Sequence, residues 1–153
     1  MLLAACTPEA PEQGGKRTAI NLETAMPGTW ESVSLRVAIN TVDGSDSSFV
    51  FEVREEEWER RLGVKPVRTY YQLDHKYRQE FTSLADSLLS TSRGMWNIFG
   101  DTLMMVEPNA TYYYEVSIEN GLAQFSTRLD WDGDGAEDDD YLGVHRKVSS
   151  STE

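Results

Sequence analysis

Three things are scarce in this sequence: cysteine, histidine and long apolar runs. A single cysteine cannot form an intramolecular disulfide, which excludes a small disulfide-stapled domain. No stretch approaches the roughly eighteen consecutive apolar residues of a membrane-spanning helix. The two histidines, His75 and His145, are far apart and each lies beside a lysine or arginine, so we expect both to be surface side chains. Because the sequence also contains no nucleophile elbow, phosphate-binding glycine loop or cysteine metal cluster, we expect no enzyme activity.

Basic residues are also few, since 14 Lys and Arg face 26 Asp and Glu and the net charge is -12. Nucleic-acid binding needs a basic stripe, and runs such as Arg60-Arg61 are too short to form one, so we expect no nucleic-acid partner. Seven of the acids lie within residues 130–140, and the rest of the chain carries only about -5, an ordinary solubilising charge. With 39% hydrophobic residues in 153 positions, we predict one globular domain with one core.

The cysteine has a distinctive setting. The segment LAAC at positions 3–6 resembles the lipobox of bacterial lipoproteins. The resemblance implies that residues 1–6 are a signal-peptide remnant, that Cys6 carries a lipid, and that the protein is extracytoplasmic and anchored in a membrane, at the outer membrane or cell surface. Only five residues precede Cys6, whereas a signal peptide needs a basic region and a longer apolar region. The alternative is a chance match in a cytoplasmic protein.

Residues 7–27 have the composition of a linker. They hold three of the five prolines, two adjacent glycines and little apolar periodicity. As a random coil, some twenty residues would hold a domain about 25 Å from its anchor. We therefore expect a flexible linker over 7–27, a folded domain over 28–148 and a disordered tail over 149–153.

From residue 28 onward, apolar residues recur at every second position, as in a strand with one buried face. Val33, Leu35, Val37 and Ile39 show this alternation, and Asp43-Gly44 then predicts a hairpin turn. Further strands are predicted at 49–53, 66–74, 76–82, 94–99, 102–107, 111–119, 122–130 and 140–148. Segments 54–63 and 83–92 fit either short helices or strand ends and loops. The fold class predicted is all-β: an antiparallel up-and-down meander of about eight to ten strands that closes into a small β-barrel.

Gly28-Thr29-Trp30 opens the first predicted strand in the manner of the G-x-W motif of lipocalins, and residues 28–148 resemble the lipocalin-like lipoproteins of bacteria. The resemblance implies that a basic residue of the last strand lies across the tryptophan that closes one end of the barrel. Arg146 matches that residue by position. A cation over an indole face contributes about 0.5–2 kcal/mol. The alternative for Trp30 is a plain core aromatic.

The acidic segment DWDGDGAEDDDY at 130–141 has the ligand spacing of a calcium loop. Carboxylates at alternate positions point toward one centre, a glycine permits a sharp turn, and a backbone carbonyl adds an oxygen. The predicted ligands, at positions 1, 3, 5, 7 and 9 of the loop, are Asp130, Asp132, Asp134, Ala136 (by its carbonyl) and Asp138.

An EF-hand also needs a glutamate at position 12, where this chain has Tyr141. Helices flank the loop of an EF-hand, whereas the flanks of this segment are predicted to be strands. The segment more closely resembles the calcium-binding hairpin loops of integrin alpha-subunits, and the resemblance implies structural Ca²⁺ between two strands. Glu137, Asp139 and Asp140 receive no role. The alternative is an acidic hairpin that keeps the rim of a barrel soluble.

Two functions fit these features. A barrel with a cavity would bind a small apolar molecule, and the predicted cavity residues are Phe49, Phe51, Tyr71, Leu73, Trp96 and Tyr114. A barrel with a filled interior would instead act as a calcium-stabilised structural or protein-interaction module at the cell surface. These side chains are bulky, which disfavours a large cavity, and a void above roughly 300 Å³ would favour the binder. A protease inhibitor with a projecting segment near 84–93 is a third reading.

Overall fold

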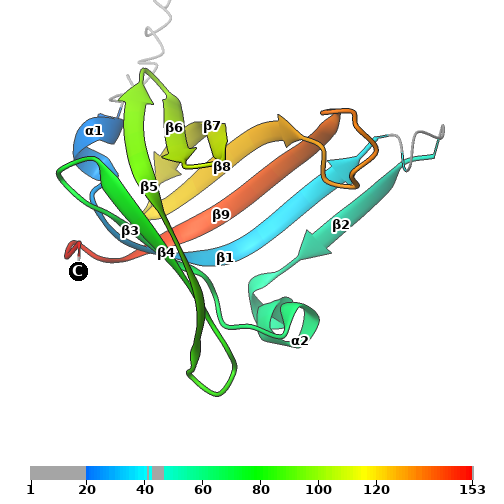
Figure 1. The fold of residues 1–153 in the computed structure, drawn as a ribbon, viewed down its shortest axis with the longest axis horizontal. Coiled ribbons are helices and arrows are strands. Elements are labelled where there is room, and N and C mark those ends of the chain that lie inside the picture. Colours follow the sequence, from blue (N-terminus) through cyan, green and yellow to red (C-terminus); the bar gives the residue numbers. More distant parts are fainter. Residues whose placement is uncertain (1–19, 41, 43–46, 153) are drawn as a thin grey trace, which may run out of the picture.

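The computed structural model describes residues 20–40, 42 and 47–152. Nine antiparallel strands form one sheet in the order β2-β1-β3-β4-β5-β6-β7-β8-β9. An additional pairing of β1 with β9 closes the sheet into an eight-stranded barrel, and β2 lies outside the closed ring (Figure 1). The predicted all-β meander is therefore confirmed, and its form is consistent with a lipocalin-like fold.

The elements follow the chain in this order: α1 (Leu22–Ala25), β1 (Gly28–Ile39), β2 (Phe49–Val53), η2 (Glu55–Glu57), α2 (Trp58–Leu62), β3 (Arg68–Tyr71), β4 (Lys76–Thr82), β5 (Leu88–Phe99), β6 (Thr102–Glu107), β7 (Ala110–Glu119), β8 (Leu122–Leu129) and β9 (Asp139–Ser149). Segment 54–63 is thus largely helical, whereas segment 83–92 is a turn followed by the first part of β5. The predicted strand over 66–74 shortens to β3, because residues 73–75 form the turn into β4. The Asp43-Gly44 turn lies outside the described residues.

Strand β1 organises the barrel because it pairs with three other strands. Its first residues pair with β3 in the register Gly28↔Tyr71, and its last residues pair with β2 as far as Ile39↔Phe49. Along its other edge it pairs with β9, with a bulge between Ser32 and Ser34. Since β1 runs the whole height of the barrel, α1 at its start and the β8–β9 loop at its end lie at opposite ends of the molecule (Figure 1).

Helix α1 covers the end of the barrel where β1 begins, and we call this the closed end. Leu22 is 4% exposed and Met26 is fully buried, and both join the barrel core. Asn21 caps the helix by accepting a hydrogen bond from the Glu23 backbone N–H. The predicted linker over 7–27 is therefore wrong for its last residues, because the two apolar side chains of such a short helix give no periodic signal.

The closed end also explains the glycine of the G-x-W motif. Gly28 has a φ of +136°, and a Cβ there would lie 2.6 Å from the Ser149 carbonyl oxygen and 2.7 Å from Lys147 Cε. Only a residue without a side chain lets β9 approach this closely. The chain stays ordered beyond β9, since the Thr29 hydroxyl donates a 2.7 Å hydrogen bond to the Ser151 carbonyl. The sequence predicts that the tail begins at residue 149, but β9 runs to Ser149 and the Ser151 carbonyl contacts β1.

The cation over Trp30 is Lys147, not Arg146. Lys147 is the direct cross-strand partner of Trp30, and its Nζ lies 5.6 Å from the ring centroid. Arg146 points to the other face of β9 and forms a two-pronged ion pair with Glu55 at 2.8 and 3.1 Å. The sequence-based prediction placed the cation one residue too early in the strand. A shift of one residue along a strand moves a side chain to the opposite face.

Aromatic side chains fill the core near the closed end. Trp30, Trp96, Tyr71 and Tyr77 are each at most 2% exposed, and Leu103 is fully buried among them. The Tyr71 and Trp96 rings pack edge to face with centroids 5.8 Å apart.

Among the residues that the structure describes, no helix is long and apolar enough to cross a membrane.

Candidate functional site

The end of the barrel opposite α1, which we call the open end, carries the acidic loop over residues 130–138 between β8 and β9. Backbone N–H groups fold the loop around its own carboxylates. Asp130 accepts hydrogen bonds from the backbone nitrogens of Asp134 (3.0 Å) and Gly135 (2.9 Å). Gly135 has a φ of +91°, which favours glycine at this sharp turn. The loop is therefore folded around the Asp130 carboxylate between two paired strands.

Asp139, which received no role from the sequence, is the most buried carboxylate of the loop region, with 0% exposure. It accepts hydrogen bonds from the backbone nitrogens of Trp131 (2.7 Å), Asp132 (3.4 Å) and Asn40 (3.3 Å). These three donors compensate for the loss of hydration of the buried carboxylate. It also joins the loop to the end of β1.

Asp130, Asp132 and Asp139 form a group in which one carboxylate oxygen from each lies within 4.8 Å of the others. Like charges at this separation repel one another, and the group could hold a metal ion. Two predicted ligands, Asp130 and Asp132, are in this group. Asp134 lies outside it, and its Oδ1 accepts a 2.8 Å hydrogen bond from the Ala136 nitrogen.

Asp138 also lies outside the group, and its backbone carbonyl accepts a 2.6 Å hydrogen bond from the Asn40 side-chain amide. The role of Asp139 has a signal in the sequence. Asp139, Tyr141 and His145 occupy alternate positions of one strand and so share its inner face. Counting ligand positions from Asp130 gave Asp139 no role, because the count treated Asp139 as part of the loop rather than as part of the strand.

The open end also presents a row of aromatic rings, which we call the aromatic row; its members are Tyr112, Tyr114, Tyr141, Trp131 and Phe51. Successive ring centroids along the row lie 6.4, 6.2, 6.4 and 6.0 Å apart. Three of the four contacts are stacked, with interplanar angles of 25°, 24° and 29°. Arg61 lies 5.1 Å over the Phe51 ring at one end of the row.

The carboxylate group and the aromatic row adjoin each other at Trp131. It lies between Asp130 and Asp132 in the chain, and its backbone nitrogen donates to Asp139. Its indole is 43% exposed and stacks on Tyr141. Anything that moves the carboxylates therefore also moves an exposed ring of the row.

The predicted cavity residues separate into three sets. Tyr71 and Trp96 are buried in the packed core of the closed end, and Phe51 and Tyr114 belong to the aromatic row. The prediction is wrong for Leu73, which is 78% exposed in the turn before β4, and for Phe49, which is 55% exposed on β2 outside the closed ring. Both follow the alternating pattern of a strand, but the barrel wall does not extend to them.

A shallow, open slot of about 470 Å³ lies beside the aromatic row, lined by three tyrosines (Tyr113, Tyr114 and Tyr141) and six polar or charged residues (Thr102, Glu115, Ser126, Thr127, Arg128 and Asp140). It arises because β7 changes partner along its length. Residues 110–115 of β7 pair with β6, and residues 115–119 pair with β8, so the two registers overlap at Glu115. The last residues of β8 therefore separate from β7, and the wall opens there.

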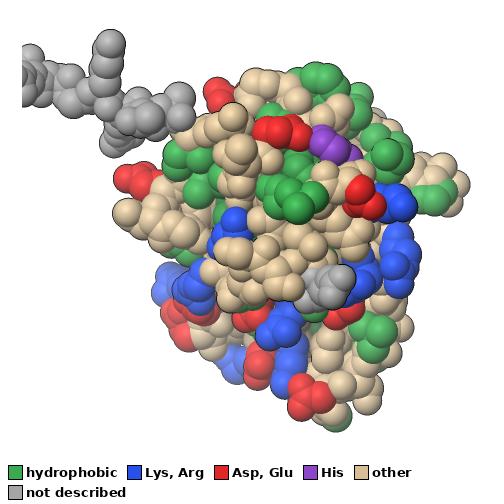
Figure 2. All heavy atoms as spheres, turned by 90° about the vertical axis from the view of Figure 1, so that its left-hand side faces the viewer, with side chains coloured by type: hydrophobic (Ala, Val, Ile, Leu, Met, Phe, Trp, Pro, Cys, Tyr) green, Lys and Arg blue, Asp and Glu red, His purple; other side chains and the backbone are tan. Residues whose placement is uncertain are grey.

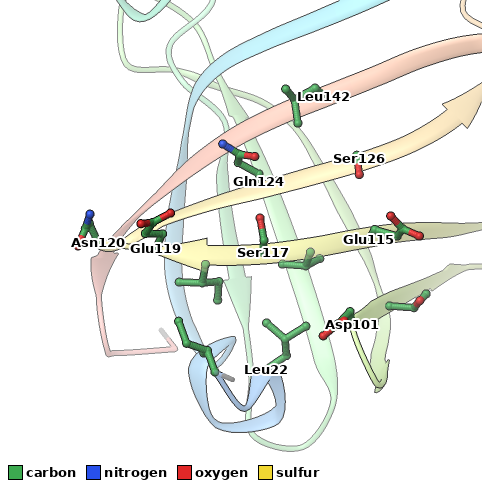
Figure 3. Close-up of a pocket in the computed structure, with 13 residues that line it drawn as sticks. Leu22, Asp101, Glu115, Ser117, Glu119, Asn120, Gln124, Ser126 and Leu142 are labelled. Atoms are coloured by element: carbon green, nitrogen blue, oxygen red, sulfur yellow. The ribbon is translucent and has the colours of Figure 1, made fainter. Parts of the chain in front are cut away.

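A larger groove of about 820 Å³ lies beside α1, where β6 begins and β7 continues toward Glu119 (Figure 3). Its labelled side chains are mainly polar, including Glu115, Ser117, Glu119 and Gln124, with Leu22 of α1 below them. This groove runs along the wall and has neither the apolar lining nor the enclosure of a lipocalin calyx.

His145 is not the surface residue predicted from its basic neighbour. Its ring packs against Phe125 with centroids 4.6 Å apart, and its Nδ1 is enclosed and has no hydrogen-bond partner among the described residues. Burial lowers the pKa of His145 from 6.5 to about 4, so the ring is neutral at pH 7. Burial likewise raises the pKa of Tyr114 and Tyr141, which keeps both phenols protonated.

Charge is distributed unevenly between the two ends. Between residues 94 and 145 the chain has eleven acids and one base, Arg128, and that base is held by Asp140 at 3.0 Å. On the closed-end side, Lys and Arg side chains gather over the middle and lower face and alternate with acids (Figure 2). Seven of the eleven acids lie within residues 130–140, so the acidic loop at the open end is strongly negative.

No protein-family model and no curated protein sequence matches this chain.

Proposed function

We propose that this protein is a membrane-anchored, extracytoplasmic barrel of lipocalin type that binds a small apolar molecule at its open end. We further propose that a structural calcium ion holds that end in its binding conformation. The observation that carries the proposal is the aromatic row, in which the exposed indole of Trp131 is held within the carboxylate loop.

Calcium fits the carboxylate group better than other common cations. Ca²⁺ binds six to eight oxygens at about 2.3–2.6 Å, and oxygens that share such an ion lie within about 5 Å of one another, as in the group of Asp130, Asp132 and Asp139. Mg²⁺ gives up its water reluctantly, which disfavours a site with several carboxylates. Calcium modules outside the cytoplasm work at about 10⁻⁴ to 10⁻³ M, which this hairpin loop would suit.

The ion would act on the binding surface through the backbone. Neutralising the three carboxylates lets the Asp139 side chain hold the Trp131 nitrogen, and the indole then stacks between Tyr141 and Phe51. Without the ion, repulsion among the carboxylates opposes this geometry. Calcium therefore completes the aromatic row.

The chemistry of the open end selects the ligand. Stacked rings offer a flat apolar surface, and the adjoining slot of about 470 Å³ lies within the range of small-molecule sites. The acidic surroundings repel anions, so fatty acids and other carboxylates are disfavoured. We infer a neutral or cationic apolar molecule that rests on the row and enters the slot.

A lipid on Cys6 would place the barrel at a membrane surface. Cys6 lies outside the described residues, and the support is the LAAC segment. Intact-mass measurement of protein extracted from a bacterial envelope tests this: a diacylglycerol on a new N-terminal Cys6 is expected, and an unmodified Met1 start would contradict it.

The alternative is a filled-core, calcium-stabilised structural or protein-interaction module. The packing of Trp30, Trp96 and Tyr71 at the closed end favours it, because these side chains leave little room for a ligand deep in the barrel. On this alternative the open end would contact a protein rather than a small molecule.

Fluorescence quenching separates the two functions. Trp131 is the exposed tryptophan, whereas Trp30, Trp58 and Trp96 are at most 5% exposed, so an aqueous quencher reports mainly on Trp131. Below their micellar concentrations, octyltrimethylammonium and octanoate serve as a cationic and an anionic probe of equal chain length. We expect the cation to shield Trp131 saturably in calcium and octanoate to do so far less.

Trp131→Phe is the matched control, since it keeps a stacking ring but removes the reporting indole. Its remaining fluorescence should not respond to either probe. Equal, non-saturating effects of both probes on the wild type would contradict small-molecule binding and favour the interaction module.

A further inference from the structure

The β4–β5 hairpin projects away from the barrel (Figure 1) and has one edge that the described part of the chain leaves uncovered. Residues 88–94 of β5 pair with β4 on one side, whereas pairing with β6 begins only at Met95. Along residues 88–93 no hydrogen bond to another described segment occupies the second side. Such an edge carries free backbone donors and acceptors at alternate positions and readily pairs with another strand.

The opposite side of the hairpin is held firmly. The Lys65 nitrogen donates a 3.0 Å hydrogen bond to the Thr82 carbonyl, and the Lys65 ammonium pairs with Asp86 at the tip. A bridge between Val64 and Ser83 adds a further contact. The hairpin is thus a rigid extension of the barrel, and its exposed edge is already in an extended conformation.

The edge lacks the usual protection against pairing. Residues 87–92, with the sequence SLLSTS, contain no charge, proline or glycine. Leu88 and Leu89 are 60% and 59% exposed, and Leu84 at the tip is 49% exposed. Soluble proteins commonly place lysine, proline or a covering loop on such edges.

Strand β2, the other edge of the sheet, is better protected. The Arg61 guanidinium donates to the Glu52 carbonyl and so covers part of that edge. Glu52 itself places a charge in the middle of the strand. Pairing of a second chain is therefore favoured at β5.

We propose that a second copy of this chain pairs antiparallel along residues 89–93 of β5, so that the two hairpins form one continuous sheet across a two-fold axis at Thr91. This register places Thr91 opposite Thr91 of the second copy and Ser90 opposite Ser92, pairs that suit antiparallel strands. Leu89 then faces Arg93, whose aliphatic stem covers the leucine.

A second copy fits this edge because the segment is self-complementary. Residues 89–92 carry no charge and so meet their own copy without opposing like charges, and the single cation of the pairing strand, Arg93, faces Leu89 instead of its equivalent. The interface is isologous and closes at two chains, because pairing consumes the free edge of each hairpin. The proposal is independent of the calcium site and of the ligand.

Sedimentation velocity of the full chain, with a reductant to prevent disulfides through Cys6, tests the pairing. The wild type is expected to show a concentration-dependent monomer–dimer equilibrium. Leu89→Lys sets a lysine against Arg93 of the second copy and should weaken association at least tenfold. Leu73→Lys is the matched control: Leu73 is 78% exposed and lies away from the edge, so dimerisation should persist.

A second measurement keeps the proposal falsifiable if Leu89→Lys fails to fold. In a Cys6→Ser background, Thr91→Cys places two thiols opposite each other at the two-fold axis, within disulfide reach. It should crosslink under mild oxidation, whereas Ser117→Cys, an exposed position on β7, should not.

Two results would overturn the proposal. A wild type that stays monomeric up to about 0.5 mM does not self-associate through this edge, and the edge would then be free to pair with a strand of another protein. A dimer that survives Leu89→Lys without crosslinking of Thr91→Cys uses another surface.

Discussion

At the scale of single residues, Lys147 shows why the closed end holds together. Its ammonium donates a 2.9 Å hydrogen bond to the Ala25 carbonyl, and the Trp30 indole donates 2.8 Å to the Met26 carbonyl. These are the last carbonyls of α1, which the short helix cannot satisfy internally. Burial lowers the pKa of Lys147, and the position above the indole face compensates the charge.

We therefore expect Lys147→Met to reduce the free energy of unfolding by about 1–2 kcal/mol, the sum of a lost charged hydrogen bond and a lost cation–π contact. Urea denaturation measures this. Arg146→Met, one residue away, removes only an exposed ion pair with Glu55 and should change stability little. A larger effect of Arg146→Met would return the closing role to Arg146.

His145 predicts a dependence of stability on pH. Its pKa is about 4 in the folded protein and about 6.5 in the unfolded chain, so only the unfolded chain takes up a proton between these values. Acidification from pH 7 to pH 4.5 should then cost about 1–3 kcal/mol through this residue, at about 1.36 kcal/mol per pKa unit. Below pH 4 both states are protonated and the loss stops growing.

Chemical denaturation of wild type and His145→Gln across this pH range isolates the contribution. The variant should show a flatter profile between pH 6.5 and 4, and His75→Gln controls for removal of the other histidine. If His145→Gln has the same slope as the wild type, the ring is accessible to water and the account of its burial is wrong.

Asp139 links the loop to the barrel and to calcium. Asp139→Asn replaces a charged acceptor of three backbone N–H groups and should cost about 1–3 kcal/mol in millimolar calcium. With a chelator the loss should shrink, because the neutral side chain also relieves repulsion from Asp130 and Asp132. Glu137→Gln makes the same charge change at an exposed position and should leave both values nearly unchanged. Calcium-independent destabilisation would argue against a shared ion.

At the scale of elements, alternation of apolar residues predicted most strands because each barrel wall has one buried face. Alternation did not predict the segments in which burial is not confined to one face of a strand. Helix α1 buries Leu22, its C-cap residue Met26 is buried as well, and the segment is too short to show a period. The first half of β5 projects beyond the barrel with both faces partly exposed, so SLLSTS carries no alternation.

Gly94 marks where β5 enters the barrel wall, and its role is close packing. A Cβ at this position would lie 2.1 Å from the Val106 carbonyl oxygen and 2.8 Å from the Tyr77 ring. Gly94→Ala should therefore push β5 and β6 apart and cost about 1–3 kcal/mol, a fall of several degrees in Tm by calorimetry. Ser92→Ala on the same strand should stay within about 0.5 kcal/mol. An unchanged Tm for Gly94→Ala would show that the wall can relax.

At the scale of the whole molecule, the two ends of the barrel differ in packing and charge. The closed end combines α1, Trp30 and Lys147, and the open end combines the carboxylate group with the aromatic row. The sequence predicted the place of the acidic loop and two of its three grouped carboxylates. It could not predict the aromatic row, because Phe51, Trp131 and Tyr114 come from three separate segments that only barrel closure brings together.

The proposed binding site depends most on whether calcium at the acidic loop fixes Trp131 within the aromatic row. A calcium titration followed by the indole N–H resonances of the four tryptophans in ¹H–¹⁵N NMR tests it directly. We predict a saturable shift of the Trp131 resonance with a midpoint near about 10⁻⁴ to 10⁻³ M, while Trp30 and Trp96 at the closed end stay in place. A Trp131 resonance that does not move up to about 10 mM calcium, well above that range, would contradict the account.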